Sequence, residues 1–229
     1  MAEGRSLQIA TSGMHCISSW IARPPGTPKG GVVVAQEIFG VNAHVRSLVE
    51  RVADAGYVGI APAFFDHLET GVELDYDDAG IARGRALVGE LGLERAVDDV
   101  MAAAETIASA GRIGVVGFCW GGSVALLAAL RHRLPAVSFY GARNVAWLAP
   151  TEVPLQFHFG DRDASIPPEA VQRHRDVLPH AEVFTYPAGH GFHCDQRADF
   201  EPASAALAWR RTLAFLERHV AATRAEDTA

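Results

Sequence analysis

Short apolar runs rich in β-branched residues recur along the chain, and turn residues bound each of them. Such runs predict strands that are buried on both faces of a sheet. The pattern is clear in three runs: Gly31 to Ala35, Ile113 to Phe118 and Val153 to Phe159. It is weaker in three others: Tyr57 to Ala61, Ala136 to Tyr140 and Ala181 to Tyr186.

The segments between these runs follow a helical period. From Ala43 to Ala55, apolar residues recur every three or four positions, which predicts an amphipathic helix that ends at Gly56. The stretch from Phe65 to Asp78 is acidic and lacks this period, so we expect an irregular loop over the site. Three further segments share the helical period: Leu93 to Ala108, Ser123 to Leu130 and Ala203 to Val220.

Strands and helices therefore alternate along the chain. Alternation of this kind requires parallel strands joined by crossover helices, which predicts an α/β fold with a mostly parallel central sheet and helices on both faces. Ligands of such sheets bind at the carboxyl ends of the strands. Because no repeat and no linker interrupts the 229 residues, we expect one domain over residues 1–229.

Composition and charge narrow the class of protein. The formal net charge is −7 and no run of Lys or Arg occurs, which argues against nucleic acid as a partner. Three widely spaced cysteines without a CxxC pair favour a reducing compartment over a disulfide framework. The N-terminal sequence does not resemble a signal peptide and no apolar run has the length of a membrane span, so we expect a cytoplasmic protein that does not bind membranes.

The sequence Gly117-Phe118-Cys119-Trp120-Gly121 joins a predicted strand to a predicted helix. It has the form of a nucleophile elbow, in which a sharp turn exposes the middle residue and small flanking residues let the backbone pass. The N-terminus of the following helix would stabilise a thiolate on Cys119. The alternative is that Cys119 is a small buried apolar residue, as free cysteines usually are.

A nucleophile in this context needs an acid and a histidine later in the chain. Asp163 follows the predicted strand Val153 to Phe159 in a G-x-x-D-x-x-I-P pattern, and we favour it over Asp161, which suits a local turn. His190 lies between two glycines after the last predicted strand. A loop histidine is commonly only solvated, but its position downstream of the acid marks His190 as the catalytic base.

A metal site is the weaker interpretation of the histidines near the C-terminus. His190, His193 and Cys194 form an H-x-x-H-C sequence without a matching second cluster of ligands. The remaining histidines show no identifiable partner, and Cys16 and Cys194 fit structural or incidental roles. We therefore expect neither a metal nor another cofactor.

Four sequence motifs in this order resemble the dienelactone hydrolase family of α/β-hydrolases over nearly the whole chain. They are Gln36-Glu37-Ile38-Phe39-Gly40 after a strand, the cysteine elbow, Gly160-Asp161-Arg162-Asp163-Ala164-Ser165-Ile166-Pro167, and Ala188-Gly189-His190-Gly191-Phe192. The resemblance implies a triad of Cys119, His190 and Asp163, with Glu37 as a fourth catalytic residue. Without the other motifs, Glu37 would be read as a surface carboxylate.

The resemblance also implies a mechanism. The resting thiol of Cys119 would be hydrogen-bonded to Glu37, and substrate binding would turn it towards His190. The backbone N–H groups of Ile38 and Trp120 would form the oxyanion hole. Attack on a small activated lactone would give an acyl-thioester that water hydrolyses.

The substrate-binding residues depart from the family pattern. The resemblance implies one arginine before the LVGEL helix, residues 87–91, where Arg83 and Arg85 are the candidates. A second arginine is expected shortly after the catalytic histidine, but Cys194 occupies that place and the nearest substitute is Arg197. Each could equally be a surface charge. Trp120 is bulkier than the aliphatic residue expected beside the nucleophile.

The sequence therefore predicts a cysteine-dependent hydrolase of carboxylic esters whose substrate is a small lactone. The first alternative is a general ester or thioester hydrolase, and the second is a non-catalytic ligand-binding or redox-sensing protein. The intact acid and histidine favour an enzyme, since a binding protein needs neither. The resemblance further implies a monomer.

Overall fold

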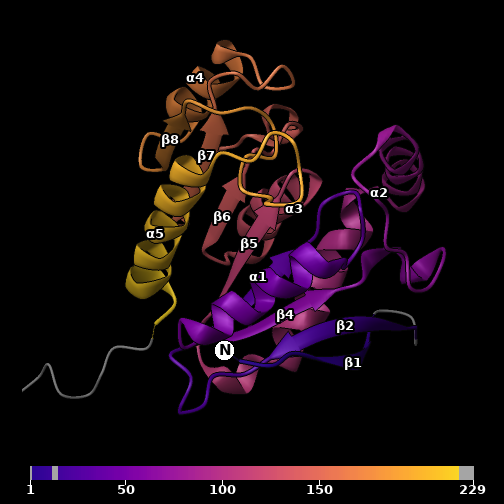
Figure 1. Cartoon of the computed structure of the whole chain (residues 1–229). Coiled ribbons are helices and arrows are strands. Elements are labelled where there is room, and N and C mark those ends of the chain that lie inside the picture. Colours follow the sequence, from indigo (N-terminus) through magenta and orange to yellow (C-terminus); the bar gives the residue numbers. More distant parts are fainter. Residues whose placement is uncertain (1, 12–14, 222–229) are drawn as a thin grey trace, which may run out of the picture.

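The protein is described here by a computed structural model that covers residues 2–11 and 15–221. Within these residues, eight strands form one sheet in the order β1-β2-β4-β3-β5-β6-β7-β8 (Figure 1). Neighbouring strands from β4 to β8 are parallel, whereas β2 runs antiparallel to both β1 and β4. The strands are β1 (Arg5–Ala10), β2 (Cys16–Ala22), β3 (Gly31–Ala35), β4 (Val58–Pro62), β5 (Ile113–Phe118), β6 (Ala136–Phe139), β7 (Leu155–Gly160) and β8 (Glu182–Tyr186).

Helices cover both faces of this sheet (Figure 1). One face carries α1 (Ala43–Asp54) and α5 (Pro202–His219), which meet where the guanidinium of Arg51 lies over the ring of Trp209. The other face carries α2 (Asp78–Thr106) and α3 (Trp120–His132), joined by an ion pair between Glu94 and Arg131. The shorter helices are α4 (Pro168–Val177), which packs near β8, and the 3-10 helices η1 (Phe64–His67), η2 (Ala108–Ala110) and η3 (Asn144–Trp147).

The predicted fold class is confirmed, and all six predicted strands are present as β3 to β8. The antiparallel pair β1 and β2 was not predicted. The apolar and polar residues of β2 follow no regular period, although its burial alternates over most of its length. Short antiparallel strands that face solvent on one side lack the continuous apolar run of a strand buried on both faces.

The helices differ from prediction mainly at α2. Asn42 caps α1 by accepting a hydrogen bond from the N–H of Val45 at 3.2 Å, and Gly56 follows the helix at φ +97°, as the sequence suggested. The predicted helix from Leu93 is only the second half of α2, because α2 begins at Asp78 and Gly92, at φ +77°, divides it. The first half carries no strong apolar period, so the pattern did not reveal it.

The core lies along the central strands. Val32, Val33 and Val34 of β3 and Val115 and Val116 of β5 are fully buried, each contributing roughly 1.5–3 kcal/mol relative to an exposed side chain. The parallel strands aim their carboxyl ends at one edge of the sheet, where the chain leaves for the loops that carry the candidate site. None of the helices in the described part of the chain is both long and apolar enough to cross a bilayer.

Candidate active site

Cys119 occupies a strained turn between β5 and α3. Its φ is +54° and its ψ is −119°, a conformation that residues other than glycine rarely adopt. A Cβ atom on Gly117 would collide with the carbonyl oxygen of Gly121, and one on Gly121 would collide with that of Ala35. The turn therefore requires glycine on both sides, and it holds the thiol at the carboxyl edge of the sheet.

His190 lies between the thiol and a carboxylate. Its Nε2 is 3.2 Å from the Sγ of Cys119, and its Nδ1 donates to the Oδ2 of Asp163 at 2.7 Å. The other oxygen of Asp163 accepts the backbone N–H of Ser165 at 2.8 Å, which fixes the carboxylate. Asp161, the alternative acid, is exposed and lies 3.9 Å from Arg162. The loops after β5, β7 and β8 thus bring together the residues that the sequence nominated as a triad.

The charged form of His190 is favoured by its partners. Burial alone would lower the pKa of His190, but the hydrogen bonds to Asp163 and Cys119, together with the charges of both, raise it to about 10. An imidazolium at this position stabilises a thiolate. The arrangement therefore suits proton transfer from the thiol to the ring.

Glu37 is fully buried at the end of β3 and is not a surface carboxylate. Its Oε1 lies 3.5 Å from the Nη1 of Arg197, and its Oε2 has no hydrogen-bond partner within residues 2–11 and 15–221. The expected resting contact between Glu37 and the thiol is not the one that this structure shows, because the thiol of Cys119 is hydrogen-bonded to His190 instead.

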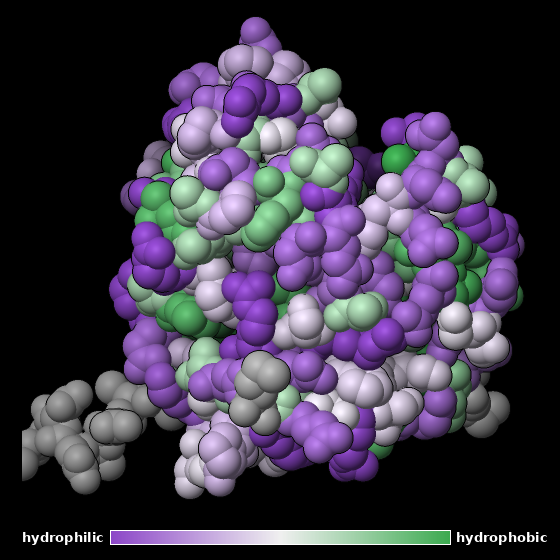
Figure 2. Space-filling view, viewed as in Figure 1, coloured by the Kyte–Doolittle hydropathy of each residue, from purple (hydrophilic) through white to green (hydrophobic). Residues whose placement is uncertain are grey.

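Cys119, His190 and Arg197 line a cavity of about 380 Å³. The surface is hollowed between the body that carries α4 and β7 and the projecting first half of α2 (Figure 2). The lining residues are Ile38, Phe39, Ile81, Arg85, Cys119, Trp120, Ala142, Arg143, Ser165, His190 and Arg197. A cavity of this volume accommodates a small organic molecule.

The three candidate arginines separate in the structure. Arg197 lines the cavity, and its guanidinium lies 5.8 Å from the ring centres of both Phe39 and Tyr76. Arg85 also lines the cavity. Arg83 does not line it: its half-exposed side chain pairs with Glu69 at 2.5 Å. Two of the three candidates are thus placed to meet a ligand.

Sequence reasoning missed two polar side chains at the site. Arg143 lines the cavity after β6, and the ring of Tyr140 lies 5.2 Å from the ring of His190. The hydroxyl of Tyr140 is buried and has no hydrogen-bond partner among the described residues. Tyr140 is the last residue of the predicted strand Ala136 to Tyr140 and Arg143 follows it. Ligands of parallel sheets bind at this carboxyl end, and this position was the signal that could have revealed both residues.

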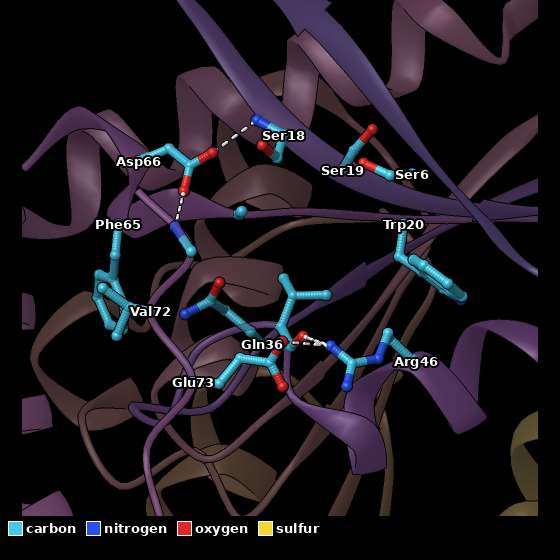
Figure 3. Close-up of a pocket in the computed structure, with 13 residues that line it drawn as sticks. Ser6, Ser18, Ser19, Trp20, Gln36, Arg46, Phe65, Asp66, Val72 and Glu73 are labelled. Atoms are coloured by element: carbon cyan, nitrogen blue, oxygen red, sulfur yellow. Dashed lines mark hydrogen bonds and ion pairs between the residues drawn. The ribbon is translucent and has the colours of Figure 1, made fainter. Parts of the chain in front are cut away.

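A second pocket, of about 210 Å³, lies between β2 and the segment after η1 (Figure 3). Its polar groups are paired with one another: Asp66 accepts the N–H groups of Ser18 and Gly71, and Arg46 pairs with Glu73 at 2.6 Å. Its described lining contains no histidine or cysteine. Cys119 and His190, the predicted nucleophile and base, line the first cavity and therefore mark it as the candidate active site.

Comparison with known proteins agrees with this geometry. Residues 17–220 match the model of the dienelactone hydrolase family. A protein of Synechocystis assigned as a carboxymethylenebutenolidase is 36% identical over 218 residues, which cover 85% of this chain and 89% of the relative. The carboxymethylenebutenolidase of Pseudomonas putida is 31% identical over 229 residues, covering 94% of this chain and 96% of that protein.

A solved structure shares the whole architecture. A protein of Klebsiella pneumoniae assigned as a dienelactone hydrolase superposes with a TM-score of 0.82 at 30% identity, covering 94% of this chain and 99% of that chain. The family match spans most of the chain, and these relatives hydrolyse, by their names, a lactone ester. This chain therefore belongs to the dienelactone hydrolase family and is an α/β-hydrolase that acts on carboxylic ester bonds.

Proposed function

We propose that this hydrolase uses Cys119 as its nucleophile and opens a small activated lactone through an acyl-thioester. The observation that carries the proposal is the position of His190, which lines the cavity with Cys119 and whose two ring nitrogens meet the thiol and the buried Asp163. A nucleophile, its base and the group that orients the base are the three parts that acyl transfer requires.

The reaction follows from these contacts. The Cys119 thiol gives its proton to His190, and the sulfur attacks the lactone carbonyl to form a tetrahedral oxyanion. When the C–O bond of the ring breaks, the imidazolium of His190 returns the proton to the leaving oxygen, which stays attached to the acyl chain. Water, deprotonated by His190, then attacks the thioester, and the sulfur leaves as the thiol. Asp163 holds His190 in the required orientation throughout.

The backbone N–H groups of Ile38 and Trp120 are the proposed oxyanion hole. Trp120 is the first residue of α3, where an N–H has no acceptor within the helix. Ile38 lines the same cavity beside Cys119. Loss of one such donor typically costs about 3 kcal/mol of transition-state stabilisation.

Glu37 is proposed as the fourth catalytic residue. Its buried Oε2, which has no partner within the described residues, is available to accept the S–H of Cys119 when the thiol turns away from His190. A thiol that is held neutral between turnovers is less open to oxidation and alkylation than a thiolate. The other oxygen of Glu37 lies 3.5 Å from the guanidinium of Arg197.

An anionic, activated lactone suits this cavity best. Arg85, Arg143 and Arg197 line it, so a carboxylated substrate would find guanidinium partners. A thiolate is itself a good leaving group, which favours esters with enol-like leaving groups over amides. We infer that the substrate is of the dienelactone type, formed during the breakdown of aromatic compounds, and that the protein acts as a single-domain monomer in the cytoplasm.

Steady-state hydrolysis of a carboxylated dienelactone and of neutral aryl esters tests the proposal. We expect the wild type to prefer the dienelactone, Cys119→Ser to be nearly inactive, and Cys16→Ser, which removes an exposed thiol on β2, to retain full activity. Equal or better cleavage of aryl esters would reduce the assignment to a general cysteine esterase. Full activity of Cys119→Ser or Cys119→Ala would overturn it, and ligand binding without turnover would indicate a non-catalytic protein.

A further inference from the structure

Three side chains with metal-binding atoms meet near the active site without belonging to the triad. They are His44 in the first turn of α1 and Cys194 and Asp195 in the loop after β8. One ligand atom from each lies within 4.8 Å of the other two. Some 150 residues of sequence separate His44 from the other pair, so the fold alone assembles the cluster.

The distance between two of the three donor atoms fits a coordination site. His44 Nδ1 lies 3.3 Å from Asp195 Oδ1. Two ligand atoms bound to one tetrahedral zinc ion at about 2.0–2.1 Å lie about 3.4 Å apart. A cation between these two atoms therefore requires little movement of either side chain.

The buried histidine supplies an independent observation. The side chain of His44 is 2% exposed, and neither of its ring nitrogens makes a hydrogen bond of good geometry within the described residues. Buried polar atoms of native proteins nearly always have a partner, so each exception calls for an explanation. A metal ion on Nδ1 provides one.

The cluster reaches solvent on one side, which leaves a route for the ion. The side chain of Asp195 is 65% exposed, whereas Cys194 is fully buried. The cluster thus runs inward from solvent.

We propose that His44, Cys194 and Asp195 bind a borderline-soft divalent cation of the Zn²⁺ class. One nitrogen, one sulfur and one carboxylate oxygen form a donor set that zinc accepts, with water as the fourth ligand. On binding, the Cys194 thiol releases its proton to solvent and the sulfur forms the bond to the metal. The site is distinct from the triad and does not depend on the proposed reaction.

Cobalt titration of the full chain tests this site. In a Cys16→Ser/Cys119→Ser variant, Cys194 is the sole remaining thiol, so a thiolate-to-cobalt charge-transfer band reports on it alone. We expect one Co²⁺ per chain to give this band with the intense visible absorption of a four-coordinate ion, and Zn²⁺ to displace it. Adding Cys194→Ser should abolish the band.

Single changes of the other ligands complete the test. His44→Gln and Asp195→Asn should each weaken cobalt binding by about tenfold or more, the scale on which even outer partners of metal ligands act. Asp195 is exposed, so Asp195→Asn tests the site even if Cys194→Ser fails to fold. The proposal is overturned if the thiol-depleted variant gives no band at millimolar cobalt, or if Asp195→Asn and His44→Gln bind as tightly as their parent.

Discussion

Two buried carboxylate–histidine pairs occur in the described structure, and only one belongs to the candidate active site. Asp163 and His190 are 2.7 Å apart, and Asp99 and His67 are 2.9 Å apart. The carboxylate side chain is fully buried in both pairs. Hydrogen-bond distance and burial therefore do not distinguish the pair at the candidate active site from the other pair.

The further contacts of the two histidines distinguish the two pairs. The second ring nitrogen of His190 meets Cys119, whereas the ring of His67 packs edge-on against His15 with 6.1 Å between ring centres. No cysteine or serine side chain is hydrogen-bonded to His67 in the described part of the chain. A carboxylate–histidine pair thus suits catalysis only where the second ring nitrogen meets a nucleophile and a cavity for the substrate lies beside it.

The largest expected effect is on turnover by the first pair. Asp163→Asn should lower kcat/KM about 10⁴-fold, because a neutral amide neither orients His190 in the correct tautomer nor stabilises its charge. Asp99→Asn is the matched control: the same chemical change in an equally buried carboxylate should leave kcat/KM unchanged. Ester hydrolysis by the two purified variants measures both values. Comparable losses in both would remove the distinction between the pairs.

A smaller effect concerns the free energy of unfolding. Each of the two carboxylate–histidine pairs should make it depend on pH, but in a different pH range. Burial raises the pKa of Asp99 from 3.8 to about 6, outweighing the opposing contact with His67. Folding therefore favours the protonated carboxyl, whose contribution is complete below pH 3.8 and is lost as pH rises to about 6. Relative to Asp99→Asn, the free energy of unfolding of the wild type should fall by about 3 kcal/mol across that range.

The contribution of His190 should be lost at higher pH. Because its pKa is raised from 6.5 to about 10, the stability due to the imidazolium is complete below pH 6.5 and declines as pH approaches 10. Urea unfolding of the wild type, Asp99→Asn and His190→Gln between pH 3.5 and 10 separates the two ranges. If the free energies of unfolding of the wild type and of Asp99→Asn change with pH in parallel below pH 6, burial does not raise the pKa of Asp99 and this prediction is wrong.

Much of the fold follows from local sequence pattern. The six parallel strands are short runs of mostly apolar residues bounded by turn residues, and the elbow at Cys119 has a fixed spacing of glycines, so both could be predicted. The pair β1 and β2 and the first half of α2 could not, because their apolar periods are weak. The nominated Cys119, His190 and Asp163 meet in space because parallel strands bring their carboxyl ends to one edge.

Other parts of the site depend on contacts between distant segments. Arg83 and Arg85 lie two positions apart on α2 and look alike in sequence, but only Arg85 lines the cavity. Likewise, His193 and Cys194 suggested ligands without a second cluster, and the start of α1 supplies His44 beside Cys194. The side of a helix on which a residue lies and the packing of distant loops determine which of these residues reach the site. Neither can be predicted from a local motif.

The smallest expected effect comes from comparing two arginine–glutamate pairs, as the first prediction compared two carboxylate–histidine pairs. Arg197 faces buried Glu37 at the cavity, and Arg83 faces exposed Glu69 outside it. Losing a guanidinium that pairs with the substrate carboxylate in a partly buried site costs about 2 kcal/mol or more, whereas an exposed pair such as Arg83–Glu69 contributes about 0–1 kcal/mol. Arg197→Gln should therefore lower kcat/KM for a carboxylated lactone about thirtyfold relative to a neutral aryl ester, and Arg83→Gln should leave that ratio unchanged. Equal losses for both esters in Arg197→Gln would assign Arg197 to holding Glu37 in place and not to binding the substrate carboxylate.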